Sequence, residues 1–169
     1  LWGETYDEVR KVIAKVRAAC ARNGRAAPRF SVSFRPILAD TEEKAWAKAE
    51  ATLARAKAVQ DKTGFVRKPD GPANEGSKRL LALAAQGERL DKRLWTGMAA
   101  LTGARGNSTS LVGTPQQVAE SLLEYYELGI DIFLIRGFDP LIDAIEYGRD
   151  LVPIIRAEMK KRERQLAHA

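Results

Sequence analysis

Residues 106–140 constrain the fold of this chain most strongly, because they spell out a loop, a helix, a strand and a second loop with a signal at each boundary. Thr114 can cap a helix, and Pro115 suits its first turn. Gln117 stands three residues after the cap, where a capping box requires Gln or Glu. Gly129 most easily adopts the left-handed conformation that closes a helix. The stretch therefore predicts a helix that begins at Pro115 and ends before Gly129.

A strand is predicted directly after this helix, over residues 130–135. Only Asp131 interrupts the apolar run, a pattern typical of a parallel strand that is covered on both faces. Arg136, Gly137 and Phe138 come immediately after it. Ligands of α/β folds bind at the carboxyl ends of the strands, so these three residues are candidates for a binding site.

Residues 29–38 predict a second strand, because they alternate in polarity and are rich in Phe, Val and Ile. The two-residue period of a strand divides their side chains between two faces: Ser31, Ser33 and Arg35 on one, Phe30, Val32 and Phe34 on the other. Pro36 lacks an N–H, so the pairing of this strand is expected to stop near it.

Helices are predicted for residues 6–23, 42–60 and 77–86 from the helical spacing of their apolar side chains. Another helix is predicted from residue 141, with Asp139 as its cap and with a continuation past Pro153. The order of strand, helix, strand and helix indicates an α/β fold with parallel strands.

Two segments carry turn signals instead of periodicity. Residues 62–77 are charged and rich in Gly and Pro, which predicts an exposed insertion. Residues 102–110 are small, polar and rich in Gly, which predicts a mobile loop. Backbone amides of such a loop can also approach an anion, and the sequence leaves both interpretations open.

Composition excludes several classes of function. The formal charge is +6, but the basic residues are scattered or gathered near the C-terminus without the interleaved aromatics of a nucleic-acid site. Cys20 is the only cysteine and His168, next to the end, the only histidine. An internal disulfide is therefore impossible, and a His-based triad and a metal site are not expected. With no segment of membrane-spanning length and no signal peptide at the start, a cytoplasmic protein is expected.

Several motifs together resemble the C-terminal part of bacterial luciferase-like, flavin-dependent monooxygenases, with the alkanesulfonate monooxygenases as the closest likeness. They lie in residues 1–4 (LWGE), 30–41, 94–95 (LW), 110–115 (SLVGTP), 128–131 (LGID) and 137–138 (GF). The resemblance covers nearly the whole chain apart from residues 62–77. The segment from Leu111 to Pro140 is its most specific part.

The resemblance implies that residues 1–169 form one partial domain, the C-terminal portion of a luciferase-like (β/α)8 TIM barrel. The strands expected here are too few to close a barrel. A lone copy would expose strand edges and apolar helix faces. We therefore expect that the chain is not an autonomous monomer, and that a homo-oligomer or a complementing chain supplies what is missing.

The resemblance also implies an enzyme that uses reduced FMN and molecular oxygen to release sulfite and an aldehyde from an alkanesulfonate or a similar small organic substrate. A flavin reductase is the expected source of the reduced flavin. Ser33 and Arg35 stand where alkanesulfonate monooxygenases place an Arg and a His, so a guanidinium is retained but displaced by two residues. Arg35 is expected to pair with a sulfonate or a peroxide anion, and a salt bridge at the barrel rim is the alternative.

Four further residues are placed in the site by resemblance. Trp2 corresponds to a strand-end tryptophan of the pocket, or else to a packed core aromatic. Arg105 lies where the family has an Arg on a closing loop, although an ordinary exposed Arg is an equal alternative. Phe138 replaces a tyrosine and cannot donate a proton, and Arg136 forms the rim beside it with Asp139. Arg35 and Arg105 are thus the catalytic candidates.

Two other functions remain open at this stage. The chain could belong to another luciferase-like oxidoreductase, such as an alkane monooxygenase or an enzyme that depends on coenzyme F420. It could also be a non-catalytic half-barrel that acts only with a partner chain.

Overall fold

The computed structural model describes residues 1–64, 74–105 and 109–167. Its elements follow the order α1 (Tyr6–Arg22), β1 (Ser31–Phe34), β2 (Ile37–Leu38), α2 (Glu42–Thr63), α3 (Glu75–Gln86), β3 (Arg89–Leu90), β4 (Leu94–Trp95), α4 (Gly97–Thr102), β5 (Ser110–Gly113), α5 (Pro115–Glu127), β6 (Ile132–Ile135), α6 (Pro140–Glu146), the π-helical segment η1 (Tyr147–Leu151) and α7 (Val152–Ala167).

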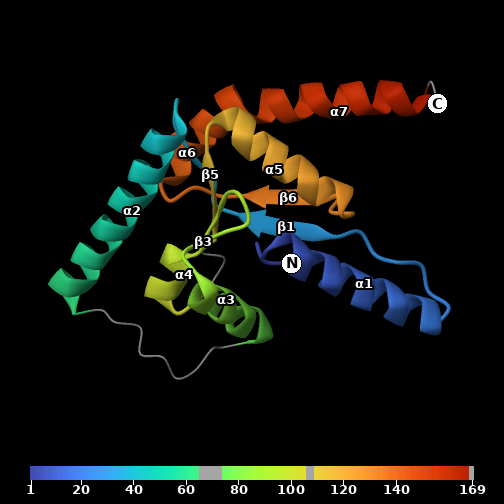
Figure 1. Ribbon diagram of the computed structural model, residues 1–169, viewed down its shortest axis with the longest axis horizontal. Helices are drawn as coiled ribbons and strands as arrows, with labels where there is room; N and C mark the ends of the chain where they lie inside the picture. Colours follow the sequence, from blue (N-terminus) through green and yellow to red (C-terminus); the bar gives the residue numbers. More distant parts are fainter. Residues whose placement is uncertain (65–73, 106–108, 168–169) are drawn as a thin grey trace.

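Strands β1 and β6 lie side by side and run parallel at the centre of the molecule (Figure 1). Their register pairs Ser31 with Ile132 and Phe34 with Ile135. On the other side of β1, Trp2 forms a parallel bridge with Ser33. The parallel arrangement predicted from the order of the elements is confirmed for β1 and β6.

The second sheet has the order β2, β5, β4, β3, with β5 parallel to β2 and antiparallel to β4. The prediction of one strand over residues 29–38 is therefore wrong in one respect, because the segment divides between two sheets. The division falls at Arg35 and Pro36, and the ring of Pro36 leaves its nitrogen without a hydrogen for a ladder bond. The backbone N–H of Arg35 donates to the carbonyl of Thr109 at 3.0 Å, where β5 is about to begin.

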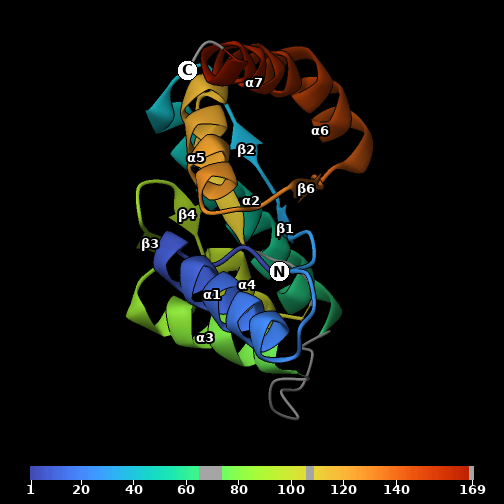
Figure 2. The same cartoon turned by 90° about the vertical axis from the view of Figure 1, so that its right-hand side faces the viewer.

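Helices α1, α5 and α7 cover one face of the β1–β6 pair, and Figure 2 shows α1 and α5 from the end of the molecule. The alternation predicted for β1 is confirmed here, because Val32 and Phe34 are fully buried against these helices. The largest cluster of the core gathers Val9 and Ile13 from α1 and Leu122 and Tyr125 from α5 on the same side. A second cluster packs α2 on β2 and β5.

The opposite face of β6 is open. Ile132 is 43% exposed and Leu134 is 49% exposed, so the prediction that both faces of this strand are covered is wrong for the chain as it stands. Helix α6 exposes Leu141, Ile142 and Ile145 as well. We call these five side chains the open apolar face. An apolar run indicates that a strand is suited to burial. Whether the strand is buried depends on a neighbouring element that packs on it.

The helix predictions are confirmed with small shifts of their ends. The capping box at Thr114 and Gln117 is present in both directions, and Asp139 caps α6. Residues 65–73 of the predicted insertion and 106–108 of the predicted loop lie outside the described residues. At their margins α2 reaches Thr63 and α3 begins at Glu75. Within the described ranges, no helix combines the length and the apolar character that crossing a membrane requires.

Candidate functional site

The carboxyl ends of β1 and β6 bring two arginines together. Phe34 and Ile135 form the last pair of the register, so Arg35 and Arg136 follow at adjacent positions. The backbone N–H of Arg136 donates to the carbonyl of Phe34 at 3.1 Å, which continues the ladder by one bond. Two positive charges therefore stand at the edge of the sheet where α/β folds bind their ligands.

The guanidinium of Arg35 is held by the loop after β6. Its Nη1 donates to the carbonyl of Gly137 at 2.6 Å, and its Cζ lies 5.3 Å from the ring centre of Phe138. Burial lowers the pKa of Arg35, and the charge of Arg136 lowers it further. An anion placed here would offset both effects, because it would compensate the desolvated charge and relieve the repulsion.

Two cavities adjoin the segments that follow β1 and β6. One, of about 370 Å³, is lined by Arg35, Ile135, Arg136, Gly137, Pro140, Ala144 and Tyr147. The other, of about 200 Å³, lies on the α2 side and is lined by Phe138 together with residues that include Lys48, Arg55 and Ile142. Both combine cationic and apolar groups, a combination that suits a small organic anion.

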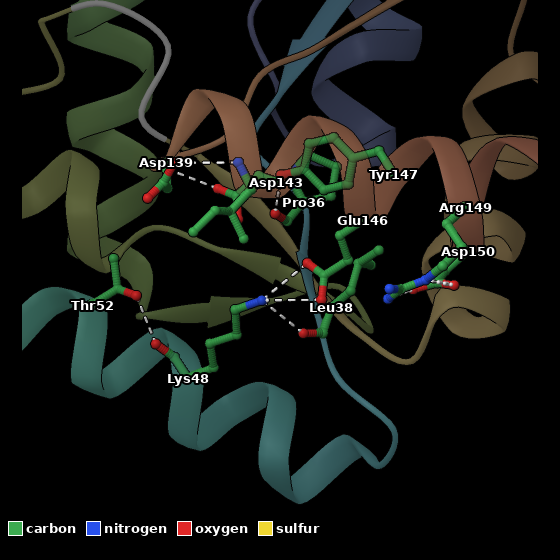
Figure 3. A network of polar contacts seen from close by, with 11 residues as sticks. Pro36, Leu38, Lys48, Thr52, Asp139, Asp143, Glu146, Tyr147, Arg149 and Asp150 are labelled. Atoms are coloured by element: carbon green, nitrogen blue, oxygen red, sulfur yellow. Dashed lines mark hydrogen bonds and ion pairs between the residues drawn. The ribbon is translucent and has the colours of Figure 1, made fainter.

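A network of polar contacts connects the segments that follow β1 and β6 to α2, α6 and η1 (Figure 3). Lys48 of α2 donates to the carbonyl of Leu38 at 3.1 Å and forms an ion pair with Glu146 at 3.0 Å. The hydroxyl of Tyr147 donates to the carbonyl of Pro36 at 2.5 Å. Asp143 accepts from the backbone N–H of Asp139 at 2.9 Å. Helix α6 and the start of η1 are thereby joined to the ends of both β1 and β6.

Ser33 lies two residues before Arg35 in β1, and Trp2 pairs with it on the other side of that strand. Ser33 is 8% exposed and sits between the Trp2 bridge and its register partner Leu134. The Trp2 ring packs on the cluster formed by α3, α4 and Ala104. Its contacts are thus those of a packed aromatic at a strand end, and the pocket role proposed for it stays a prediction.

Arg105 follows Ala104, which is fully buried in that same cluster. Its side chain is partly exposed, and it precedes residues 106–108, which are not described. Closure of this loop over the site therefore stays a prediction. Of the predicted site residues, the structure brings Arg35, Arg136 and Phe138 into direct neighbourhood, with Trp2 beside Ser33 on the adjoining strand.

Asp143 and Tyr147 are parts of the site that the sequence did not reveal. Together with the cap residue Asp139 they recur every four positions, which places them on one face of a helix. That spacing, directly after a strand end, is the signal that could have identified them. Among the described residues, no group of three or more His, Cys, Asp and Glu side chains is arranged to hold a metal ion.

A model of the family described as luciferase-like monooxygenase matches residues 1–131, which is more than half of the 169 residues. The chain belongs to the luciferase-like monooxygenase family. The family part of the resemblance is confirmed, and the match includes Trp2, Ser33, Arg35 and Arg105 but ends before Arg136.

Solved structures show the same fold. A riboflavin lyase with modified FMN and riboflavin is 24% identical, with a TM-score of 0.63 over 94% of this chain and 38% of that one. An EDTA monooxygenase from Chelativorans sp. BNC1 is 23% identical, with a TM-score of 0.60 over 91% of this chain and 38% of that one. A long-chain alkane monooxygenase is 19% identical, with a TM-score of 0.56 over 95% and 36%.

These likenesses confirm that the luciferase-like chain has an α/β fold that corresponds to part of a TIM barrel. The chain spans somewhat more than a third of the length of the solved structures it matches. It therefore accounts for one portion of a family domain.

Proposed function

We propose that the complete protein is a reduced-flavin-dependent monooxygenase and that this chain supplies the part of its pocket that binds an anionic substrate. The substrate that we propose first is an alkanesulfonate, which the enzyme would convert to sulfite and an aldehyde. The observation that carries the proposal is the guanidinium of Arg35, held over Phe138 by the carbonyl of Gly137 and next to Arg136, at the strand ends of a luciferase-like fold.

An anionic substrate follows from the chemistry of these groups. Guanidinium groups present planar donor pairs that match the oxygens of a sulfonate or carboxylate. Partial burial strengthens such a contact, because the surrounding dielectric is lower than that of water. Phe138 can contact the organic part of the substrate through its ring, but it has no hydroxyl and cannot transfer a proton. Binding and orientation are therefore the roles that we assign to this loop.

Flavin is the cofactor that we propose, and oxygen its co-substrate. The residues at the carboxyl ends of β1 and β6 fit this cofactor, because Phe138 offers an aromatic surface and Arg35 and Arg136 offer positive charge. Reduced FMN supplies the reaction with oxygen when it is bound, while the protein contributes binding, orientation and electrostatics. A flavin reductase is the partner that we propose as the source of reduced FMN.

The test uses the complete protein with reduced FMN, oxygen and a series of alkanesulfonates. Oxygen consumption and sulfite release in equal amounts are expected. Arg35→Ala should raise KM for the sulfonate by about ten- to a hundredfold, since hydrogen bonds to charged groups contribute about 1.5–3 kcal/mol. Arg22→Ala, an exposed change at the end of α1, serves as the control and should leave KM unchanged. Release of no sulfite from any sulfonate would contradict the substrate proposal.

A second candidate is oxidation of an uncharged hydrophobic substrate, as in an alkane monooxygenase. The exposed side chains beside Phe138 favour it, since Ile142 lines the same cavity. In that case long-chain alkanes should be oxidised and Arg35→Ala should have little effect on KM. A parallel screen with reduced FMN and with reduced coenzyme F420 as the electron donor separates these enzymes.

We further propose that the open apolar face is covered in the complete protein, either by further barrel strands or by a partner chain. Five large exposed apolar side chains on two consecutive elements, β6 and α6, support this, since exposed apolar patches mark interaction surfaces. A half-barrel that acts only with a partner chain would also need this face to be covered. A test of the face therefore addresses both the enzyme and the half-barrel hypotheses.

A further inference from the structure

Tyr147 holds an unusual place beside the proposed anion site. It is the first residue of the π-helical segment η1 and is 4% exposed. It lines the 370 Å³ cavity together with Arg35 and Arg136. Its hydroxyl reaches 111 residues back in the sequence to donate to the carbonyl of Pro36. Single-turn π segments inside helices occur frequently at functional sites.

The hydrogen bond of Tyr147 acts on the backbone that carries Arg35. Pro36 is the next residue, and its carbonyl lies at the point where the chain passes from β1 to β2. Because Pro36 donates no hydrogen bond of its own, the Tyr147 hydroxyl is a contact that fixes this turn. A rotation of the Arg35–Pro36 turn would swing the guanidinium out of the cavity.

The other end of Arg35 is fixed by the same helix face, one turn earlier. Gly137, whose carbonyl accepts from Arg35, packs so closely on Asp143 that a Cβ at Gly137 would lie 2.2 Å from the Cβ of Asp143. Asp143 in turn accepts from the backbone N–H of Asp139. Tyr147 therefore holds the backbone next to Arg35, while Asp143 holds the loop that binds its guanidinium.

We propose that Tyr147 is a positioning residue, whose hydroxyl fixes the Arg35–Pro36 turn so that the guanidinium is oriented in advance for an anionic ligand. This inference rests on the part of the proposed function that makes Arg35 the anion-binding group. Groups that are held in place before binding lose less conformational entropy when the ligand arrives, so the effect should appear in affinity.

The experiment measures binding without turnover, in the complete protein, by isothermal titration calorimetry with octanesulfonate and with octanol. Tyr147→Phe retains the ring and removes the hydroxyl. It should weaken octanesulfonate binding by about three- to tenfold, the usual range for one hydrogen bond, and change octanol binding by less than about twofold. The control Tyr126→Phe, on the exposed side of α5, should change neither affinity.

A double variant separates positioning from general packing. In an Arg35→Ala background, Tyr147→Phe should have no further effect on octanesulfonate binding, because the group that it positions is gone. Equal losses for octanesulfonate and octanol, or a loss that persists without Arg35, would indicate a merely structural role and overturn the inference. An unchanged affinity of Tyr147→Phe for octanesulfonate, or failure of the unaltered protein to bind it, would also overturn it.

Rescue provides a second variant in case Tyr147→Phe does not fold. 4-Aminophenylalanine at position 147 keeps a donor that can reach the carbonyl of Pro36, so it should restore octanesulfonate affinity to within about twofold. A folded aminophenylalanine variant with an affinity about tenfold below that of the unaltered protein would contradict the assignment. Binding of octanesulfonate without sulfite release would refute the proposed reaction and leave the role of Tyr147 standing, so the two failures are distinguishable.

Discussion

Gly137 shows how closely the two loops of the site approach each other. A methyl group at this position would lie 2.2 Å from the Cβ and 2.3 Å from a carboxylate oxygen of Asp143. Gly137→Ala should therefore push α6 away from the loop and destabilise the fold by about 1–3 kcal/mol, the usual cost of overpacking. Thermal unfolding followed by circular dichroism should show a midpoint lowered by several degrees.

Gly148 offers a matched control for Gly137 on the neighbouring η1 segment. A Cβ built there meets no atom within 4 Å, so Gly148→Ala should leave the midpoint unchanged or raise it slightly. Equal stability of the two variants would show that the Gly137 loop moves freely and that the close contact with Asp143 is unimportant.

Single residues of the site were predictable only as far as local pattern reaches. The two-residue period placed Arg35 on the polar face of its strand, and the position after an apolar run marked Arg136 and Phe138. The bond from Arg35 to Gly137 joins residues 102 positions apart, and no local signal encodes it. For the same reason the phenol of Tyr147 could not be connected to Pro36 without the fold.

Helix α5 depends on the capping box that the sequence displays. The Thr114 hydroxyl accepts from the backbone N–H of Gln117 at 3.3 Å, and Oε1 of Gln117 accepts from the backbone N–H of Thr114 at 2.9 Å. Thr114→Ala should cost about 1 kcal/mol, because it leaves N-terminal donors of the helix unpaired. Chemical denaturation should show a lower midpoint with an unchanged slope. Gln116→Ala, which removes only an exposed contact to Glu120, should have no measurable effect.

Glu42 connects three parts of the structure and should make the stability of the fold depend on pH. Its carboxylate pairs with Arg93 before β4 and accepts from Gln117 of α5 at 2.9 Å. The hydrogen bond from Arg93, followed by that from Gln117, lowers the pKa of Glu42 from 4.5 to about 2. A lowered pKa in the folded state means that the contribution to stability is present above 4.5 and is lost as the pH falls towards 2.

Comparison with Glu42→Gln isolates this contribution. The variant should unfold at a lower temperature than the unaltered protein at pH 7, and the gap should close between pH 4.5 and 2. Glu43→Gln, at the next position of α2, is the control and should show no such dependence. A gap that stays constant down to pH 2 would contradict the assigned origin.

Elements were predictable in proportion to the local signals that they carry. Caps at Thr114 and Asp139 identified the starts of α5 and α6, and helical spacing identified α1, α2 and α3. Strands β3 and β4 contain two residues each, too few for a period, and β4 is defined by its pairing with β5 across the chain. Strand β6 was located correctly, but the coverage of its faces depends on a neighbour that its own sequence cannot specify.

At the scale of the molecule, β1 and β6 form part of a sheet, and one face of this part is not covered by other elements of the described chain. Residues 1–2, β1 and β6 lie side by side, with helices on one face only. The other face carries Ile132 and Leu134, and α6 adds three more apolar side chains. At about 25 cal/mol per Å² of apolar surface, covering these side chains would contribute several kcal/mol. The isolated chain cannot obtain that contribution without a second surface.

The chain of residues 1–169 on its own should therefore self-associate through the open apolar face. Leu141, 70% exposed on α6, is the most exposed of its members, and Leu141→Lys should reduce association in sedimentation velocity runs at increasing concentration. Val59→Lys adds the same charge at an isolated apolar side chain of α2 that is 56% exposed, and should leave association unchanged.

In the complete protein the sign of the Leu141→Lys effect should reverse. We propose that the face is covered there, so the same substitution would bury a charge and should lower the unfolding midpoint by several degrees, whereas Val59→Lys should not. An isolated chain that stays monomeric at high concentration would argue against an interaction surface. A complete protein that tolerates Leu141→Lys would show that α6 faces solvent there, and would limit the covered part to the β6 residues Ile132 and Leu134.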